Sequence, residues 1–174
     1  QAVLPSFGYV ETFLPLPVNT ELKQLIASPT EDVDYKDIVI SLNNRTYPDA
    51  GTIRLTVRVP QLFTQIDPSD GSDARYPKND LKEPKVEGYQ VKFIVYISTN
   101  GGTYVQYPTS TEYTISGKTT SGYSKTVEIP LPSDGSNYLS WRVRIRRTTE
   151  NISTMKVANT LLVDAISVIS TNQY

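Results

Sequence analysis

Residues 115–148 read ISGKTTSGYSKTVEIPLPSDGSNYLSWRVRIRRT, and this stretch decides the fold class. Across residues 141–146 apolar residues alternate with arginines, which is the two-residue repeat of a strand with one buried face. Residues 126–131 alternate in the same way, and the Pro-Ser-Asp-Gly-Ser-Asn segment between the two runs consists of turn-forming residues. The pattern predicts antiparallel strands of a β-sandwich, with Trp141 in the core opposite Phe93.

Alternating apolar residues recur along the rest of the chain, with glycine- or proline-containing turns between them. The clearest runs are residues 38–42, 53–59, 89–97 and 161–168. The sequence Asn100-Gly101-Gly102 predicts a hairpin turn, because glycine adopts positive φ at little cost. A change of parity at Ala165-Ile166 predicts a bulge or mixed burial. These signals predict an all-β, immunoglobulin- or fibronectin type III-like antiparallel β-sandwich of about seven strands.

Two segments depart from the alternating pattern. Residues 1–34 hold prolines among large apolar residues, which predicts an extended arm; within it, residues 20–26 fit either a helix or a first strand. Residues 35–174 are predicted to form the sandwich, with a long charged loop at residues 61–85 that is either solvated or ordered against a neighbour. The chain begins with Gln1 rather than methionine, and we interpret it as part of a longer protein.

Composition excludes most catalytic chemistries. The chain has no cysteine and no histidine, which rules out thiolate nucleophiles, zinc fingers and Ser-His-Asp catalysis. Its carboxylates form no recognisable motif for glycoside hydrolysis, and the spacing of Asp67, Asp70 and Asp73 does not fit an EF-hand loop. We therefore expect no enzyme, no cofactor and no metal site.

Charge and hydropathy exclude two further classes of partner. A formal net charge of −1 argues against nucleic acid and anionic membranes as general partners. No apolar run approaches the roughly 20 residues that a membrane helix needs. We expect neither nucleic-acid binding nor membrane insertion.

The basic row formed by Arg142, Arg144, Arg146 and Arg147 is the first candidate binding surface. It either binds phosphate groups or lies in solvent with carboxylate partners on neighbouring strands. The absence of a glycine-rich cradle and of a flanking basic run favours the second interpretation.

Tyrosines are the second candidate, since the chain has 12 of them and only one tryptophan. Tyr104, Tyr107 and Tyr113 fall on two adjoining predicted strands. A tyrosine ring with its polar tip suits stacking on sugars or a hydrated protein interface. Tyrosine is also a good strand former, so a packing role is the alternative.

The third candidate is an apolar pair on a face that should be solvent-exposed. On the strand that contains Phe93, the outward parity includes Ile94 and Tyr96. We expect these two residues either to be covered by the N-terminal arm, through Phe7, Phe13 or Leu14, or to form a surface for a partner.

Several short motifs share their order with one family. They are Gln1, Pro5, Phe7, Thr20-Glu21-Leu22-Lys23, Arg54-Leu55-Thr56, Asn100-Gly101-Gly102, Gly117-Lys118-Thr119-Thr120-Ser121, and Arg144-Ile145-Arg146-Arg147 followed by Thr148. In these residues the chain resembles the tail tip attachment proteins of lambda-like phages, also called J, host-specificity or central tail fibre proteins. The resemblance covers most of the chain, although the relative is shorter at residues 61–85.

The resemblance implies a β-sandwich domain inserted into a hub domain of the tail tip protein, and it favours a strand at residues 20–26. It implies a structural, interaction-mediating role in tail assembly and host attachment, within a virion assembled in the host cytoplasm. The implied partners are other domains of the same homotrimeric protein, neighbouring tail proteins and a host cell-surface component. Two other functions stay open: a cell-surface or carbohydrate-binding module, and a fibronectin-like module of a bacterial surface protein.

Overall fold

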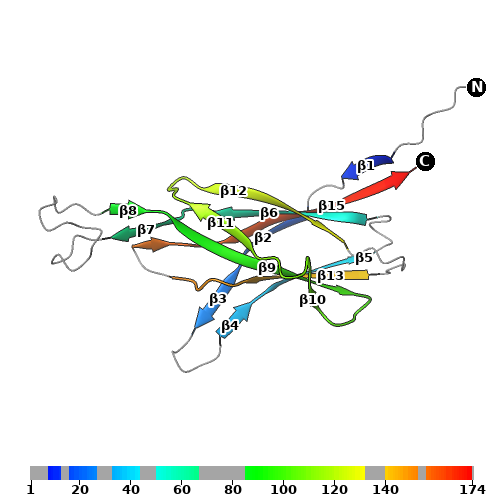
Figure 1. Cartoon of the computed structure of the whole chain (residues 1–174), viewed down its shortest axis with the longest axis horizontal. Helices are drawn as coiled ribbons and strands as arrows, with labels where there is room; N and C mark the ends of the chain where they lie inside the picture. Colours follow the sequence, from blue (N-terminus) through cyan, green and yellow to red (C-terminus); the bar gives the residue numbers. More distant parts are fainter. Residues whose placement is uncertain are drawn as a thin grey trace, which may run out of the picture.

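The described part of the chain is built from β-strands. The computed structural model describes residues 8–12, 16–26, 33–43, 50–66, 85–131, 140–152 and 156–173. Within these ranges the strands form two five-stranded sheets and two smaller ones. Figure 1 shows the two larger sheets one above the other in an elongated body. No helix in the described ranges could cross a membrane.

The first sheet is centred on the long C-terminal strand. Its members are β1 (Gly8–Thr12), β2 (Leu16–Glu21), β6 (Ala50–Val59), β12 (Tyr123–Pro130) and β15 (Leu162–Gln173). β15 pairs antiparallel with β1, β2 and β6, and β6 pairs antiparallel with β12. The register of β15 shifts between Val163 and Ala165, next to the residues at which the sequence predicts a bulge or mixed burial.

The second sheet contains the arginine-rich strand. Its members are β5 (Ile38–Asn43), β9 (Tyr89–Thr99), β10 (Val105–Gln106), β11 (Tyr113–Gly117) and β13 (Ser140–Arg147). β13 lies between β9 and β5, and β9 also pairs with the short strands β10 and β11. The predicted turn after β9 is confirmed: Asn100 and Gly101 have positive φ, and the Gly102 amide donates to the Thr99 carbonyl at 2.9 Å.

Two small sheets adjoin the sandwich, and Figure 1 shows β7 and β8 at one end and β3 and β4 projecting from its side. β7 (Phe63–Ile66) pairs with β8 (Lys85–Glu87) and β14 (Val157–Ala158), whereas β3 (Lys23–Ile26) pairs with β4 (Val33–Lys36). The fold therefore has more strands than the predicted seven. The additional strands are mostly short and adjoin loops, where an alternating pattern is too brief to be distinguished in a sequence.

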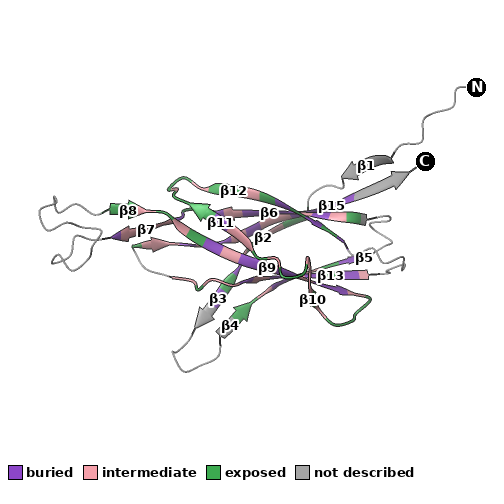
Figure 2. Ribbon diagram, in the orientation of Figure 1, coloured by how far each residue is buried: buried purple, intermediate pink, exposed green. Residues whose placement is uncertain are grey.

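The apolar core lies between the two larger sheets, as the purple segments in Figure 2 show. Trp141, Val143 and Ile145 are buried in it, and Arg142, Arg144 and Arg146 are not. The predicted β-sandwich and the predicted phase of its arginine-rich strand are therefore both confirmed.

The neighbours of Trp141 differ from the prediction. Trp141 lies opposite Thr99 on β9 and Leu42 on β5, whereas Phe93 lies opposite Arg147. The prediction that Trp141 faces Phe93 is wrong, because β9 and β13 are antiparallel and the two aromatic residues fall at opposite ends of their pairing.

The two runs in residues 115–148 also do not pair with each other. β12 joins β6 in the first sheet, and β13 joins β9 and β5 in the second. Turn-forming residues indicate that the chain reverses direction, and they do not indicate which sheet it enters next. β12 and β13, although consecutive among the described strands, thus lie in different layers of the sandwich.

The segments outside the predicted sandwich contribute strands to the fold. β2 pairs with β15, and Leu22 is fully buried, so the sandwich includes residues before position 35. Residues 20–26 belong to β2 and β3, apart from Leu22 between them, so this segment is extended as the resemblance implied. At residues 61–85, Leu62 is buried and β7 and β8 form the two ends; Asp67, Asp70 and Asp73 lie outside the described residues.

Candidate interaction surface

The outer face of the second sheet presents three cross-strand rows of side chains. Strand parity and register define them. The first row is Asp37, Arg146 and Ile94, the second is Val39, Arg144 and Tyr96, and the third is Ser41, Arg142 and Ser98. Each arginine therefore occupies the middle of a row and is flanked by residues of β9 and of the β5 segment.

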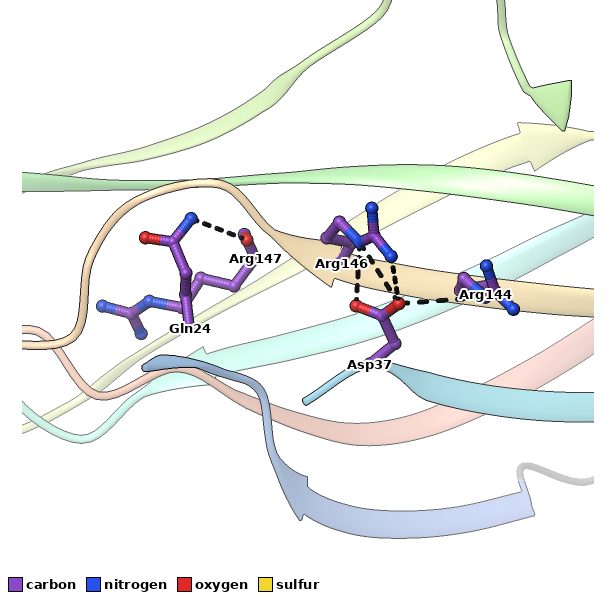
Figure 3. Close-up of polar contacts among 5 residues, drawn as sticks. All are labelled: Gln24, Asp37, Arg144, Arg146 and Arg147. Carbon is purple, nitrogen blue, oxygen red and sulfur yellow. Dashed lines mark hydrogen bonds and ion pairs between the residues drawn. The ribbon is translucent and has the colours of Figure 1, made fainter. Parts of the chain in front are cut away.

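Asp37 links the first two rows by its carboxylate (Figure 3). The Arg146 Nη2 and Nε atoms donate to Asp37 Oδ2 and Oδ1 at 2.7 and 3.0 Å, and the Arg144 Nε atom lies 3.8 Å from Oδ2. The hydrogen bonding that Arg146 donates to Asp37 is the main reason that the pKa of Arg146 lies above its ordinary value. Two of the predicted basic residues thus have the cross-strand carboxylate partner that the second interpretation required.

Tyrosine rings stack against the same two arginines. The Arg144 guanidinium lies 3.8 Å from the centre of the Tyr104 ring. The Arg146 guanidinium lies 4.2 Å from the centre of the Tyr35 ring and 5.5 Å from that of Tyr96. These distances are typical of cation–π contacts, which hold a long arginine side chain in one orientation.

We call this set of residues the Arg–Tyr surface. Its members are Tyr35, Asp37, Tyr96, Tyr104, Arg144 and Arg146. Tyrosine and arginine are the residues most enriched at protein interfaces, and here their side chains are already ordered by contacts within the domain. An ordered surface loses less conformational entropy when a partner binds.

Arg142 is the exposed member of the basic row. Its side chain has no hydrogen bond or ion pair to any residue that the structure describes. Its neighbour Ser98 is buried and donates a hydrogen bond to the Gly102 carbonyl at 2.6 Å. The charge of Arg142 is therefore available at the end of the surface.

Two of the three singled-out tyrosines lie elsewhere. Tyr113 stacks on Phe93 with ring centres 5.2 Å apart, and burial raises the pKa of its phenol. Tyr107 also packs against the core. Of the three, Tyr104 is the one that the fold brings to the arginines, because Tyr113 pairs with the inward-facing Phe93 and Tyr107 packs against the core.

Ile94 is partly buried, in the row of Arg146. The described part of the N-terminal arm, β1, pairs with β15 in the other sheet and not with β9. Phe7, Phe13 and Leu14 lie outside the described residues. The outer-face rows, and not β1, thus flank Ile94 in the described structure.

Arg147 does not belong to the outer face, which corrects its assignment to the basic row. Its side chain has inward parity and is completely buried. Its Nε and Nη2 atoms donate to the carbonyl oxygens of Thr149 and Glu150 at 2.8 and 3.3 Å, and Gln24 donates to the Arg147 carbonyl at 3.4 Å (Figure 3). Burial lowers the pKa of Arg147 to about 10, so it is still a cation at neutral pH.

A polar hollow of about 680 Å³ lies beside the outer face. Lys92 and Glu112 at its wall form an ion pair at 3.5 Å, and the Thr148 hydroxyl donates to Glu112 at 2.9 Å. These charged groups are about two-fifths exposed and satisfy each other. In the described part of the chain no group of three acidic residues could hold a metal ion.

The two-layered fold and the resemblance to tail tip proteins agree with the family whose model matches the chain. The family model for "Tip attachment protein J, FNIII-A domain" matches residues 17–171. The chain belongs to this family. The FNIII-A match begins in β2 and ends in β15, so it spans both sheets and confirms the predicted resemblance. The FNIII-A domain is thus a domain of a phage tail protein, and its family is a structural one, not a family of enzymes.

Comparisons with other known proteins add little for this FNIII-A domain. A search of curated proteins finds no match. Dimeric latent PorU from Porphyromonas gingivalis is similar at 7% identity and a TM-score of 0.41, over 99% of this chain and 13% of that chain. The family 11 carbohydrate-binding module of the cellulosomal cellulase Lic26A-Cel5E of Clostridium thermocellum is similar at 14% identity and a TM-score of 0.32, over 98% and 90% of the two chains. Likenesses this distant carry no functional argument.

Two residues of the Arg–Tyr surface, Tyr35 and Asp37, were not predicted as site residues from the sequence of the FNIII-A domain. Tyr35 and Asp37 precede β5 and have the same parity as Val39, which points outward. That parity was a usable signal, because it assigned Asp37 to the outer face. The sequence does not show which strand pairs with β5, and so it does not show which arginine would contact the Asp37 carboxylate.

Proposed function

We propose that this domain is a structural, interaction-mediating part of a phage tail tip that supports tail assembly and host attachment. The Arg–Tyr surface is the observation that carries the proposal. It combines arginines and tyrosines, ordered by contacts with one another, on the outer face of a sheet, and these residue types are enriched in protein-binding surfaces. The domain acts by binding and positioning neighbours, without catalysis.

The course of the chain supports an insertion within a larger tail protein. β1 and β15 pair antiparallel from Gly8 opposite Gln173 to Thr12 opposite Ile169. The two ends of the described chain therefore lie side by side, as Figure 1 shows. A larger domain of the tail protein could contain this domain as an insertion at one position of its chain, because the entering and leaving strands are already adjacent.

The proposed partners follow from this role. They are other domains of the same tail tip protein, which we propose to be a homotrimer, and neighbouring tail proteins. A host cell-surface component is a further proposed partner. The proposed location is the tail tip of the virion, after assembly in the host cytoplasm.

A deletion in the full-length tail protein tests the proposal. Residues 17–171 are replaced by a short Gly-Ser linker, tails are counted by electron microscopy, and adsorption to host cells is measured separately. We expect fewer complete tails or weaker adsorption, and an antibody against the domain should label the tail tip of wild-type virions. Normal tails with normal adsorption, or unlabelled virions, would overturn the proposal.

Whole-cell and glycan binding by the isolated domain test the competing function. A carbohydrate-binding module would bind cells or glycans by itself, through aromatic stacking. The structural proposal expects no such binding from the isolated domain. Binding that is lost in Tyr104→Ala and retained in Tyr113→Phe would favour the carbohydrate-binding alternative.

A further inference from the structure

Strand β5 is an open edge of the second sheet. It pairs with β13 on one side, and no described residue pairs with its other side. An unpaired strand edge presents backbone donors and acceptors to which another extended chain can bind. Natural proteins usually block such edges with charged residues, proline or bulges.

The other long edge of the sandwich carries these protective features. β12 closes the first sheet and contains Lys125, Glu128 and Pro130. β5 reads Ile-Val-Ile-Ser-Leu-Asn, without a charged residue or a proline, and its pairing with β13 shows no register shift. The edge strands β5 and β12 therefore differ in the features that prevent strand addition.

Both faces of β5 are incompletely covered. Val39 lies on the outer face and is 48% exposed. Ile40 has the inward parity of Ile38 and Leu42, and yet it is only partly buried, whereas those two are buried. A strand added beside β5 would extend both faces and would cover Val39 on one side and Ile40 on the other.

The positive charge of Arg142 beside this edge favours an added strand that carries a carboxylate. Arg142 lies opposite Ser41, is exposed and has no ion pair among the described residues. An added strand would lie about 5 Å from β5 and about 10 Å from β13. A glutamate opposite Ser41 could reach Arg142 across the small serine side chain. Arg144 and Arg146 are less available, because both already interact with the Asp37 carboxylate.

We propose that β5 accepts an extended, acidic segment of another polypeptide by antiparallel or parallel strand addition. The segment would place an apolar side chain opposite Val39 and a carboxylate opposite Ser41. This inference deepens the proposed function, because it names the edge by which the domain would hold a neighbouring tail protein. A second copy of β5 is a poorer occupant, since it would bring a second Arg142 toward the first.

Two short peptides test the proposal on the whole 174-residue chain. Both are capped, have valine and threonine in alternation, and differ at one outward position, where the first has glutamate and the second has lysine. Backbone amide shifts of the labelled domain report binding. We expect the glutamate peptide to shift the amides of residues 38–42 and to bind about fivefold more tightly than the lysine peptide.

Three variants separate the contributions to this binding. Arg142→Glu should reverse the preference between the two peptides, because the interaction depends on the sign of one charge. Val39→Lys should abolish binding of both peptides, because a lysine protects the edge. Arg54→Glu is the matched control, since Arg54 lies in the first sheet and its change should leave both affinities unaltered.

Three results would overturn the proposal. The first is the absence of amide shifts in β5 with either peptide at millimolar concentration, and the second is equal affinity for both peptides. The third is a concentration-dependent dimer of the domain that Val39→Lys abolishes, which would make a second copy the occupant. None of these results concerns the presence of the domain in virions, so the proposed function would fail or stand by its own experiment.

Discussion

The Asp37 carboxylate accepts three hydrogen bonds from the Arg146 guanidinium across the gap between the β5 segment and β13. The Nε atom donates to Oδ1 at 3.0 Å and to Oδ2 at 3.2 Å, and Nη2 donates to Oδ2 at 2.7 Å. The Asp37 side chain is 14% exposed, so water screens this pair less than it screens an exposed pair. The contact fixes the position at which Tyr35 and Tyr96 stack on Arg146.

Asp37→Asn should lower the free energy of unfolding by about 1.5–3 kcal/mol, the range for hydrogen bonds to charged groups. The change keeps the size of the side chain and removes the charge that Arg144 and Arg146 share. Urea denaturation measures the effect. Glu128→Gln is the control, because the Arg54–Glu128 pair is exposed and its loss should cost less than about 1 kcal/mol. Equal losses in the two variants would contradict a special role for Asp37.

Trp141→Ala should lower the free energy of unfolding by about 3–5 kcal/mol, because it empties a large aromatic site in the core. Arg142→Ala, one residue further along β13, is the control and should change stability by no more than about 0.5 kcal/mol. Denaturant unfolding of both variants provides the comparison. A loss as small as that of the control would mean that the Trp141 ring is not part of the core.

Gly88→Ala should destabilise the domain by about 1–3 kcal/mol through overpacking. A Cβ atom at Gly88 would lie 2.9 Å from the Gly117 carbonyl oxygen, which belongs to the backbone and has little freedom to move. Gly51→Ala is the matched control, because its nearest neighbour would be the Ile169 carbonyl oxygen at 3.9 Å. Thermal unfolding should show a lower Tm for the first variant alone. An unchanged Tm at Gly88 would contradict the close approach of the two glycines.

Tyr113→Phe should make the domain less sensitive to alkaline pH. Burial raises the pKa of Tyr113 above its ordinary value of 10.0, so the folded chain keeps the phenol proton to a higher pH than the unfolded chain does. The stability that this difference contributes is complete below the unfolded pKa and is lost as pH rises through the folded pKa. The free energy of unfolding of the wild type, relative to that of Tyr113→Phe, should therefore fall above about pH 10. A pH-independent difference between the two proteins would contradict the prediction.

The fold class could be predicted from short-range patterns. Strand parity in residues 141–146 assigned tryptophan, valine and isoleucine to the core and the arginines to the surface, and burial agrees. Arg147 shares the inward parity of Ile145, so the alternation itself places it inside, and only its charge suggested the outer basic row. Its burial as a cation is possible because its guanidinium donates to the carbonyl oxygens of Thr149 and Glu150, just after β13 ends.

The candidate surface could be predicted only in part. Parity and composition in the sequence point to Tyr96, Tyr104, Arg144 and Arg146, because aromatic and basic residues are unusual together on a solvent-facing strand. The same signal points to Tyr113, which instead stacks on Phe93. Composition identifies a residue type that suits a surface, whereas only the strand register decides which face of the sheet it occupies.

The amino-acid sequence alone determined that this protein alternates buried and exposed residues in an all-strand sandwich and that it lacks cysteine and histidine for catalysis. Both properties are local, because parity and composition depend on each residue and its near neighbours. The tertiary structure decided that β12 and β13 lie in different sheets and that Asp37 meets Arg146. Those contacts join positions far apart in the chain, and they form only when competing strand pairings are resolved by the packing of the whole core.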